Sequence, residues 1–153
     1  ASLEDLVARG ARIHAAIGDP ALRRGWLEER LDAAATVIHP SASVSPSATI
    51  GAGVFIGPRA VVNARALLET GTIVNSGAIV EHDAWVGAYA HVAPGAILLG
   101  AARAGEASLV GAGSVVLPGI EIGPGATLAA GGIATESIAA NTIAIGGPAR
   151  PRS

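Results

Sequence analysis

Residues 73–96 read IVNSGA, IVEHDA, WVGAYA and HVAPGA, which are four consecutive blocks of six residues. Each block has valine in its second position and alanine in its sixth. The second position recurs every six residues from Ile38 to Ala134, and fifteen of its seventeen occupants are Ile, Val or Leu. These three types make up 39 of the 153 residues, so about four of the seventeen would be expected by chance. The period of six is therefore a structural repeat.

This repeat predicts a parallel β-helix over residues 36–137. A short strand with one inward aliphatic and one inward small residue cannot bury its apolar face alone, so the hexads must stack. Three hexads make a triangular coil of eighteen residues, and successive coils pair in parallel at the ~4.8 Å spacing of neighbouring strands. Seventeen hexads give about six coils. Glycines such as Gly51, Gly57 and Gly111 follow the inward position, where we expect the backbone to turn sharply.

Composition excludes several classes of function. Half of the residues are apolar but only 3% are aromatic, so the core must consist of Ile, Val, Leu and Ala. The net charge of −2 gives no reason to expect nucleic acid or an anionic membrane as a partner. Without cysteine the chain has no disulfide, thiolate zinc site or cysteine nucleophile, and without lysine it has no Walker-type phosphate loop. No apolar run approaches the ~20 residues that span a bilayer, so we expect a cytoplasmic protein.

The first thirty-five residues lack the repeat. Residues 3–9 are expected to be helical, and residues 12–17 to form a short strand. Asp19 and Pro20 are typical of a helix start, and this second helix is predicted to continue to about Ala34. A helix, a strand and a helix bury too little surface to fold independently. The expected fold class is therefore all-β, a parallel β-helix with a short α/β segment at its amino end.

The hexads resemble those of the hexapeptide-repeat acyltransferases, whose β-helix is left-handed and whose active unit is a trimer. Residues 75–83, NSGAIVEHD, and residues 90–95, AHVAPG, are similar to the signature of the sugar acetyltransferases of the sialic acid and bacillosamine pathways. This resemblance implies acetyl-CoA as co-substrate, with no metal. It also implies that residues 1–35 are the remnant of a Rossmann-like substrate domain, and that residues 138–153 form a tail bordering CoA.

The same resemblance implies roles for the residues of the motif. The histidine matching His82 is the general base, and the acidic residue matching Asp83 polarises it. The residues matching Asn75 and His91 line the substrate site, and His91 also helps to position the acetyl donor. His14 lies in the predicted strand and His39 at the entrance to the β-helix. Both histidines are expected to be structural.

Further positions are expected to contact CoA. Gly100 lies eighteen residues after His82, so it should stack directly on the histidine, leave room for the thioester and offer its backbone N–H to the oxyanion. Gly111 and Ala112 are small corner residues toward the carboxyl end. The closing segment 143–150, IAIGGPAR, resembles the end of this superfamily, which implies CoA contacts for Gly147 and Arg150.

The spacing of the two motif histidines predicts the assembly. His82 and His91 are nine residues apart, or half a coil, which places them on the order of 15 Å apart across one prism. They cannot share a site within one chain. We therefore expect a homotrimer with active sites between subunits, His82 coming from one subunit and His91 from its neighbour.

The favoured function is acetylation of the 4-amino group of a nucleotide-linked amino sugar. An alternative within the same family is O-acetylation of sialic acid or another sugar hydroxyl. A zinc carbonic anhydrase on this fold would need three converging histidines, and only two lie within the coils beyond the entrance. A purely structural β-helix is the non-enzymatic alternative, and the Glu-His-Asp corner argues against it.

Overall fold

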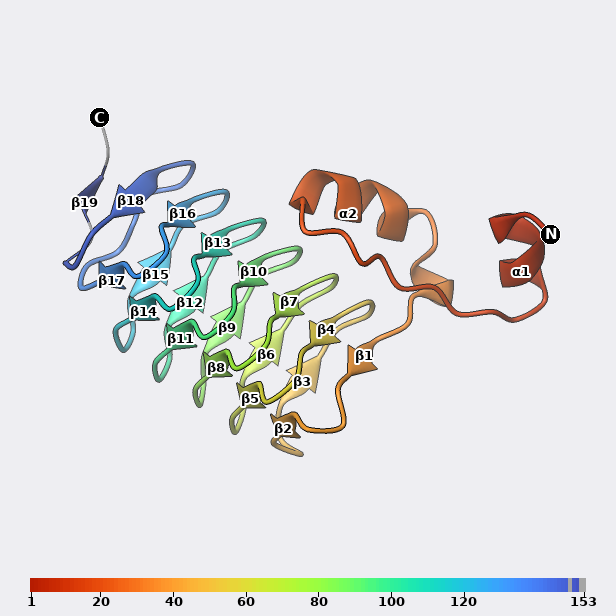
Figure 1. Ribbon diagram of the computed structural model, residues 1–153, viewed down its shortest axis with the longest axis horizontal. Helices are drawn as coiled ribbons and strands as arrows, with labels where there is room; N and C mark the ends of the chain where they lie inside the picture. The colour runs from red at the N-terminus through yellow and green to blue at the C-terminus, as the bar shows by residue number, and fades with distance from the viewer. Residues whose placement is uncertain (149, 152–153) are drawn as a thin grey trace.

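The computed structural model describes residues 1–148 and 150–151. The chain forms a left-handed parallel β-helix of about six coils, with two short helices at its amino end (Figure 1). The predicted fold class is thus confirmed. Among the described helices, none combines the length and the apolar character that a membrane crossing requires.

Three parallel sheets form the faces of the prism. The first face contains β1 (Val37–Ile38), β4 (Phe55–Ile56), β7 (Ile73–Val74), β10 (His91–Val92), β13 (Leu109–Val110), β16 (Thr127–Leu128) and β18 (Ile143–Ile145), with β19 (Arg150–Pro151) added antiparallel to β18. The second face contains β2 (Ser43–Val44), β5 (Val61–Val62), β8 (Ile79–Val80), β11 (Ile97–Leu98), β14 (Val115–Val116) and β17 (Ile133–Ala134). The third face contains β3 (Thr49–Ile50), β6 (Leu67–Leu68), β9 (Trp85–Val86), β12 (Arg103–Ala104) and β15 (Glu121–Ile122).

The register of the sheets follows the repeat. Strand partners from β1 to β17 are eighteen residues apart, as in the pairing of Ile79 with Ile97, whereas β16 and β18 pair at a spacing of sixteen. From Ile56 to Ala134 the inward residue of every hexad is at most 1% exposed. Burying such a Val, Leu or Ile side chain contributes ~1.5–3 kcal/mol, so the column of inward residues holds the prism together. Ile38 in the first coil is 46% exposed because no coil packs beneath it.

The corner glycines are required for a reason other than the predicted one. Gly111 does not have a left-handed backbone; that conformation occurs two residues later, at Gly113, with φ of 63°. A Cβ on Gly111 would instead lie 2.5 Å from Leu128 O and from Ala130 N in the next coil. Glycine is needed here because the coils stack too closely for a side chain.

The amino-terminal segment contains α1 (Leu3–Ala8), α2 (Pro20–Glu28) and a 3-10 turn (Leu31–Ala33). Asp19 caps α2 by accepting a hydrogen bond from the Leu22 N–H, as the sequence predicts. The predicted continuation of this helix to Ala34 is wrong. Ile13 exchanges backbone hydrogen bonds with residues 33 and 35, and this long-range pairing holds the chain extended there.

One buried arginine attaches this segment to the β-helix. Figure 1 shows α2 beside the prism, along the corners that precede the first-face strands. Arg23 of α2 is 1% exposed and donates hydrogen bonds to four backbone carbonyls. Two of these carbonyls belong to Ile17 and Gly18, and two belong to Gly71 and Tyr89 in the coils. The guanidinium therefore joins residues 17–18 to the prism.

Candidate active site

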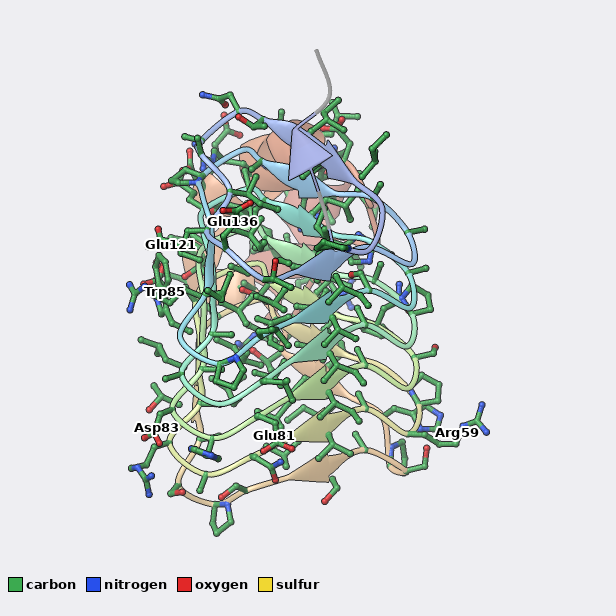
Figure 2. The ribbon with its side chains drawn as sticks, turned by 90° about the vertical axis from the view of Figure 1, so that its left-hand side faces the viewer. Arg59, Glu81, Asp83, Trp85, Glu121 and Glu136 are labelled. Carbon is green, nitrogen blue, oxygen red and sulfur yellow. The ribbon has the colours of Figure 1, made fainter. Side chains whose placement is uncertain are left out.

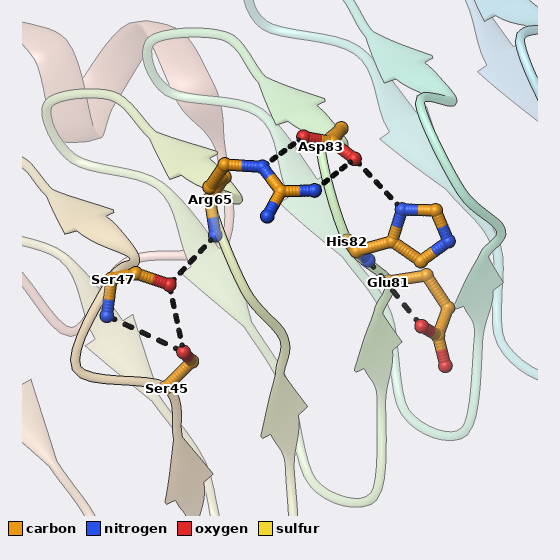
Figure 3. A network of polar contacts seen from close by, with 6 residues as sticks. All are labelled: Ser45, Ser47, Arg65, Glu81, His82 and Asp83. Atoms are coloured by element: carbon orange, nitrogen blue, oxygen red, sulfur yellow. Dashed lines mark hydrogen bonds and ion pairs between the residues drawn. The ribbon is translucent and has the colours of Figure 1, made fainter.

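His82 and Asp83 lie at the corner between β8 on the second face and β9 on the third. Asp83 has a left-handed backbone, with φ of 59°, and its N–H donates to Ala64 O in the coil below. The carbonyl of His82 accepts a hydrogen bond from the Ala101 N–H in the coil above. Both side chains are therefore presented at a corner whose backbone is fixed from both sides (Figure 3), and Figure 2 shows Asp83 at the outside of the prism.

The two side chains are hydrogen-bonded to each other. Nδ1 of His82 lies 2.8 Å from Oδ2 of Asp83. A carboxylate can only accept, so the ring donates its Nδ1–H, and Nε2 is the nitrogen that can accept a proton. This is the arrangement that a general base needs. The 59% exposure of the His82 side chain leaves it accessible to a substrate.

Arg65 completes this cluster, and sequence reasoning missed it. Its Nε donates to Oδ1 of Asp83 at 2.7 Å, and its Nη2 donates to Oδ2 at 2.8 Å (Figure 3). The hydrogen bonds from Arg65 and then from His82 lower the pKa of Asp83 to about 2, so its carboxylate stays ionised near neutral pH. The signal that could have found Arg65 is its spacing of eighteen residues from Asp83.

Gly100 lies directly over the imidazole of His82. A Cβ on Gly100 would come within 2.8 Å of both Cε1 and Nε2 of that ring. Among the described residues, no backbone acceptor is recorded for the Gly100 N–H, whereas its carbonyl accepts from the Gly119 N–H. This N–H belongs to the residue that stacks on the imidazole and has no backbone partner in the described part of the chain, so it is a candidate donor for an oxyanion.

Asn75 and His91 lie elsewhere, on the first face and its corner with the second. Nδ2 of Asn75 lies 3.1 Å from Nε2 of His91, and Oδ1 of Asn75 accepts from the Ser76 N–H. The amide therefore donates to Nε2, and the proton of the neutral ring is on Nδ1. Burial, and to a lesser extent the charge of Arg23, lowers the pKa of His91 and favours this neutral form.

A pocket of about 260 Å³ adjoins this second pair. Its walls are residues 14–18 of the amino-terminal segment on one side and Phe55, Ile73, Asn75 and His91 on the other. The ring of His14 packs against that of Phe55, with 5.8 Å between centroids, and its Nδ1 is hydrogen-bonded to Ala35 O. His14 therefore helps to build the wall of this pocket.

Within one chain, the structure does not bring the His82–Asp83 pair and the Asn75–His91 pair together. His91 belongs to the first face, whereas His82 projects from the corner opposite that face. A site that uses both residues must therefore combine two chains.

The expected CoA-contacting residues border the second face on both sides. Gly111 and Ala112 precede β14, and Gly100 follows β11. Gly147 lies beside β17, since a Cβ placed on it would be 3.4 Å from Ile133 Cδ1. The backbone of Arg150 belongs to β19, but its side chain lies outside the described residues.

Between these two borders the second face presents an apolar column. Its outward side chains stack in register through five coils. They are Val61, Ile79, Ile97, Val115 and Ile133. The last of them is 40% exposed. The other four are half-buried, and a partly exposed column of β-branched residues is suited to pack against another protein surface.

Solved structures include close matches to the whole chain. PerB from Caulobacter crescentus, in complex with CoA and GDP-perosamine, is 35% identical with a TM-score of 0.93, over 97% of this chain and 74% of that one. The acetyltransferase domain of PglB from Neisseria gonorrhoeae, in complex with acetyl coenzyme A, is 38% identical with a TM-score of 0.90, over 92% and 70%. WeeI from Acinetobacter baumannii, at 24% identity and a TM-score of 0.86, shares the fold. No protein-family model and no curated protein matches the sequence.

Proposed function

The chain belongs to the hexapeptide-repeat sugar N-acetyltransferases, and on that premise we propose that it transfers an acetyl group from acetyl-CoA to the 4-amino group of a nucleotide-linked amino sugar. The observation that carries this proposal is the hydrogen-bonded His82–Asp83 pair, whose imidazole lies against Gly100 in the next coil. The complexes of PerB with CoA and GDP-perosamine support an amine acceptor over the sugar hydroxyl that the sequence left open.

In the proposed mechanism His82 is the general base. The acceptor amine attacks the thioester carbonyl carbon, forming a C–N bond as the C–S bond breaks. Nε2 of His82 takes the proton that the amine loses, and this proton then passes to the departing thiolate. Asp83 holds the Nδ1–H and stabilises the imidazolium. A positioned base of this kind is worth ~10²–10⁴-fold in rate.

The Gly100 N–H would stabilise the negative charge that develops on the thioester oxygen. Removal of one such donor typically costs ~10²–10³-fold in kcat. Around it, Gly111, Ala112 and Gly147 offer small or backbone-rich surfaces along which an extended pantetheine arm can lie. We assign these positions and Arg150 to CoA, with residues 138–153 as the tail that borders it.

The complete site would lie between subunits of a homotrimer. One subunit would supply His82 and Asp83, and its neighbour would supply Asn75 and His91. The apolar column of the second face would pack at this interface. It runs between the two edges of that face, where the residues expected to contact CoA lie. The pocket formed with residues 14–18 would receive the acceptor, and residues 1–35 would act as part of a substrate-binding domain.

The decisive experiment is His82→Ala, with His39→Ala as the matched control. His39 is also an exposed corner histidine, hydrogen-bonded to Ser41 in the first coil, and it lies outside the proposed site. Release of free CoA thiol is followed with acetyl-CoA and a panel of nucleotide-linked 4-amino sugars. We expect His82→Ala to lose ~10²–10⁴-fold in kcat with an unchanged calorimetric Kd for acetyl-CoA. Near-normal kcat in His82→Ala would refute the assignment of the base.

A further inference from the structure

Arg65 belongs to a column of corner residues that includes the proposed base pair. Ser47, Arg65 and Asp83 occupy the same corner position in three successive coils, eighteen residues apart. The Arg65 N–H donates to Ser47 Oγ at 3.2 Å, which fixes the start of the side chain from below. Its guanidinium then reaches upward to Asp83 (Figure 3). The column thus continues, coil by coil, to the imidazole of His82.

The contact between Arg65 and Asp83 has the two-pronged geometry that arginine forms with carboxylates. Two separate N–H groups bind the two carboxylate oxygens at 2.7 and 2.8 Å. This fork fixes the plane of the carboxylate as well as its position. Oδ2 is shared, because it also accepts the Nδ1–H of His82 at 2.8 Å. The direction of the imidazole therefore depends on how firmly Asp83 is held.

The pair contributes little to folding. The side chains of Arg65 and Asp83 are 66% and 40% exposed, and solvent screening leaves such an exposed ion pair only a small net effect on stability. The same contact at a catalytic carboxylate acts on geometry, where a displacement of about 1 Å can cost ~10²-fold in rate.

We infer that Arg65 is a positioning residue for the acetyl transfer, clamping Asp83 so that His82 keeps the orientation required of the base. This inference rests on the proposed function. Three charged side chains surround His82 at this corner, namely Asp83, Arg65 and Glu81, whose carboxylate accepts the His82 backbone N–H at 3.3 Å. Arg65 is the one cation among them. Its removal leaves a more negative surrounding, which favours the imidazolium.

The chain offers a matched control in Arg59. Its backbone is also left-handed, with φ of 56° against 57° for Arg65, and its N–H likewise donates to a serine Oγ eighteen residues earlier, at 3.1 Å. The residue eighteen positions after Arg59 is Gly77, which has no carboxylate to bind. Figure 2 places Arg59 and Asp83 on opposite sides of the prism. Arg59→Gln therefore removes the same charge and side chain without touching the base.

The test compares Arg65→Gln, Arg65→Lys and Arg59→Gln in the intact protein. We expect Arg65→Gln to lower kcat about 10-fold, to leave the KM for acetyl-CoA unchanged and to move the acid limb of the kcat/KM profile upward by about 0.3–1 pH unit. Arg65→Lys should return the acid limb to its wild-type position, since charge is restored, but recover only part of kcat, since one ammonium cannot form the fork. Arg59→Gln should match the wild type in kcat, in the KM for acetyl-CoA and in the position of the acid limb.

A second readout does not depend on turnover. The Cε1–H resonance of His82, assigned by its loss in His82→Ala, is titrated by NMR in each variant. Its midpoint should move upward in Arg65→Gln and stay in place in Arg59→Gln. The inference is overturned if Arg65→Gln matches Arg59→Gln in kcat and in this midpoint, or if it only lowers the melting temperature. If His82→Ala keeps full turnover, the proposed base fails, while the NMR midpoint still reports on the contact of Arg65.

Discussion

Gly100→Ala should separate catalysis from stability. The new Cβ would lie 2.8 Å from Cε1 and Nε2 of His82, whereas non-bonded carbon contacts settle at ~3.5–4.0 Å. The ring must move by about 1 Å, which stretches its 2.8 Å hydrogen bond to Asp83 past the ~3.5 Å limit of such bonds. A displacement of this size costs ~10²-fold in rate, so we expect kcat to fall about 100-fold. The ring is 59% exposed and can yield into solvent, so the melting temperature should change by no more than a few degrees.

Thiol release gives kcat, and calorimetry gives the melting temperature. The matched comparison is Gly111→Ala, because its Cβ would meet backbone atoms of the next coil at 2.5 Å, and backbone cannot swing aside as a ring can. Overpacking of this kind costs ~1–3 kcal/mol or more, so this variant should melt well below the wild type. If Gly100→Ala keeps kcat within about threefold of the wild type, the placement of the base against Gly100 is wrong.

Three further predictions concern other parts of the molecule. The pKa of Asp83 is depressed from 3.8 to about 2, so its ion pair is fully present above about pH 4 and is lost as the pH falls through 2. The melting temperatures of the wild type and Asp83→Asn should therefore converge as the pH falls through that window. Arg23→Met leaves four backbone carbonyls without their donor, which should cost about 3 kcal/mol or more and expose residues 12–18 to faster hydrogen exchange; unchanged exchange would contradict the anchoring role. Ile97→Arg puts a charge in the apolar column. If the wild type forms the proposed trimer, light scattering should show monomers for this variant, whereas a monomeric wild type would remove the basis of the intersubunit site.

The repeat made most of the fold predictable from sequence. From β1 to β17 each strand pairs with strands eighteen residues away, so the period of six fixes register and core together. The predicted end of the second helix was wrong because Ile13, far away in sequence, pairs with the chain near Ala34. The anchor at Arg23 had no sequence signal, since arginine is rarely buried and its partners here are backbone carbonyls.

The site was predictable to a smaller extent. The proximity of His82 and Asp83 follows from their adjacency, and the stacking of Gly100 follows from the spacing of eighteen. Arg65 could have been found by the same spacing, but a search for motifs along the chain does not compare residues between coils. The role of Gly111 was misread, because the sequence shows a corner but not how closely the next coil approaches it.

The stacked register has a consequence for insertions and deletions. Arg65 meets Asp83, and Gly100 meets His82, because the two members of each contact lie eighteen residues apart at the same corner. Loss of six residues between Arg65 and Asp83 would keep the hexad pattern and the aliphatic core but turn every later residue by one face, so Arg65 and Asp83 would point from different corners. Loss of eighteen residues outside this stretch would preserve the corner and shorten the prism by one level. The fold tolerates length changes in units of six, whereas the chemistry tolerates them only in units of eighteen.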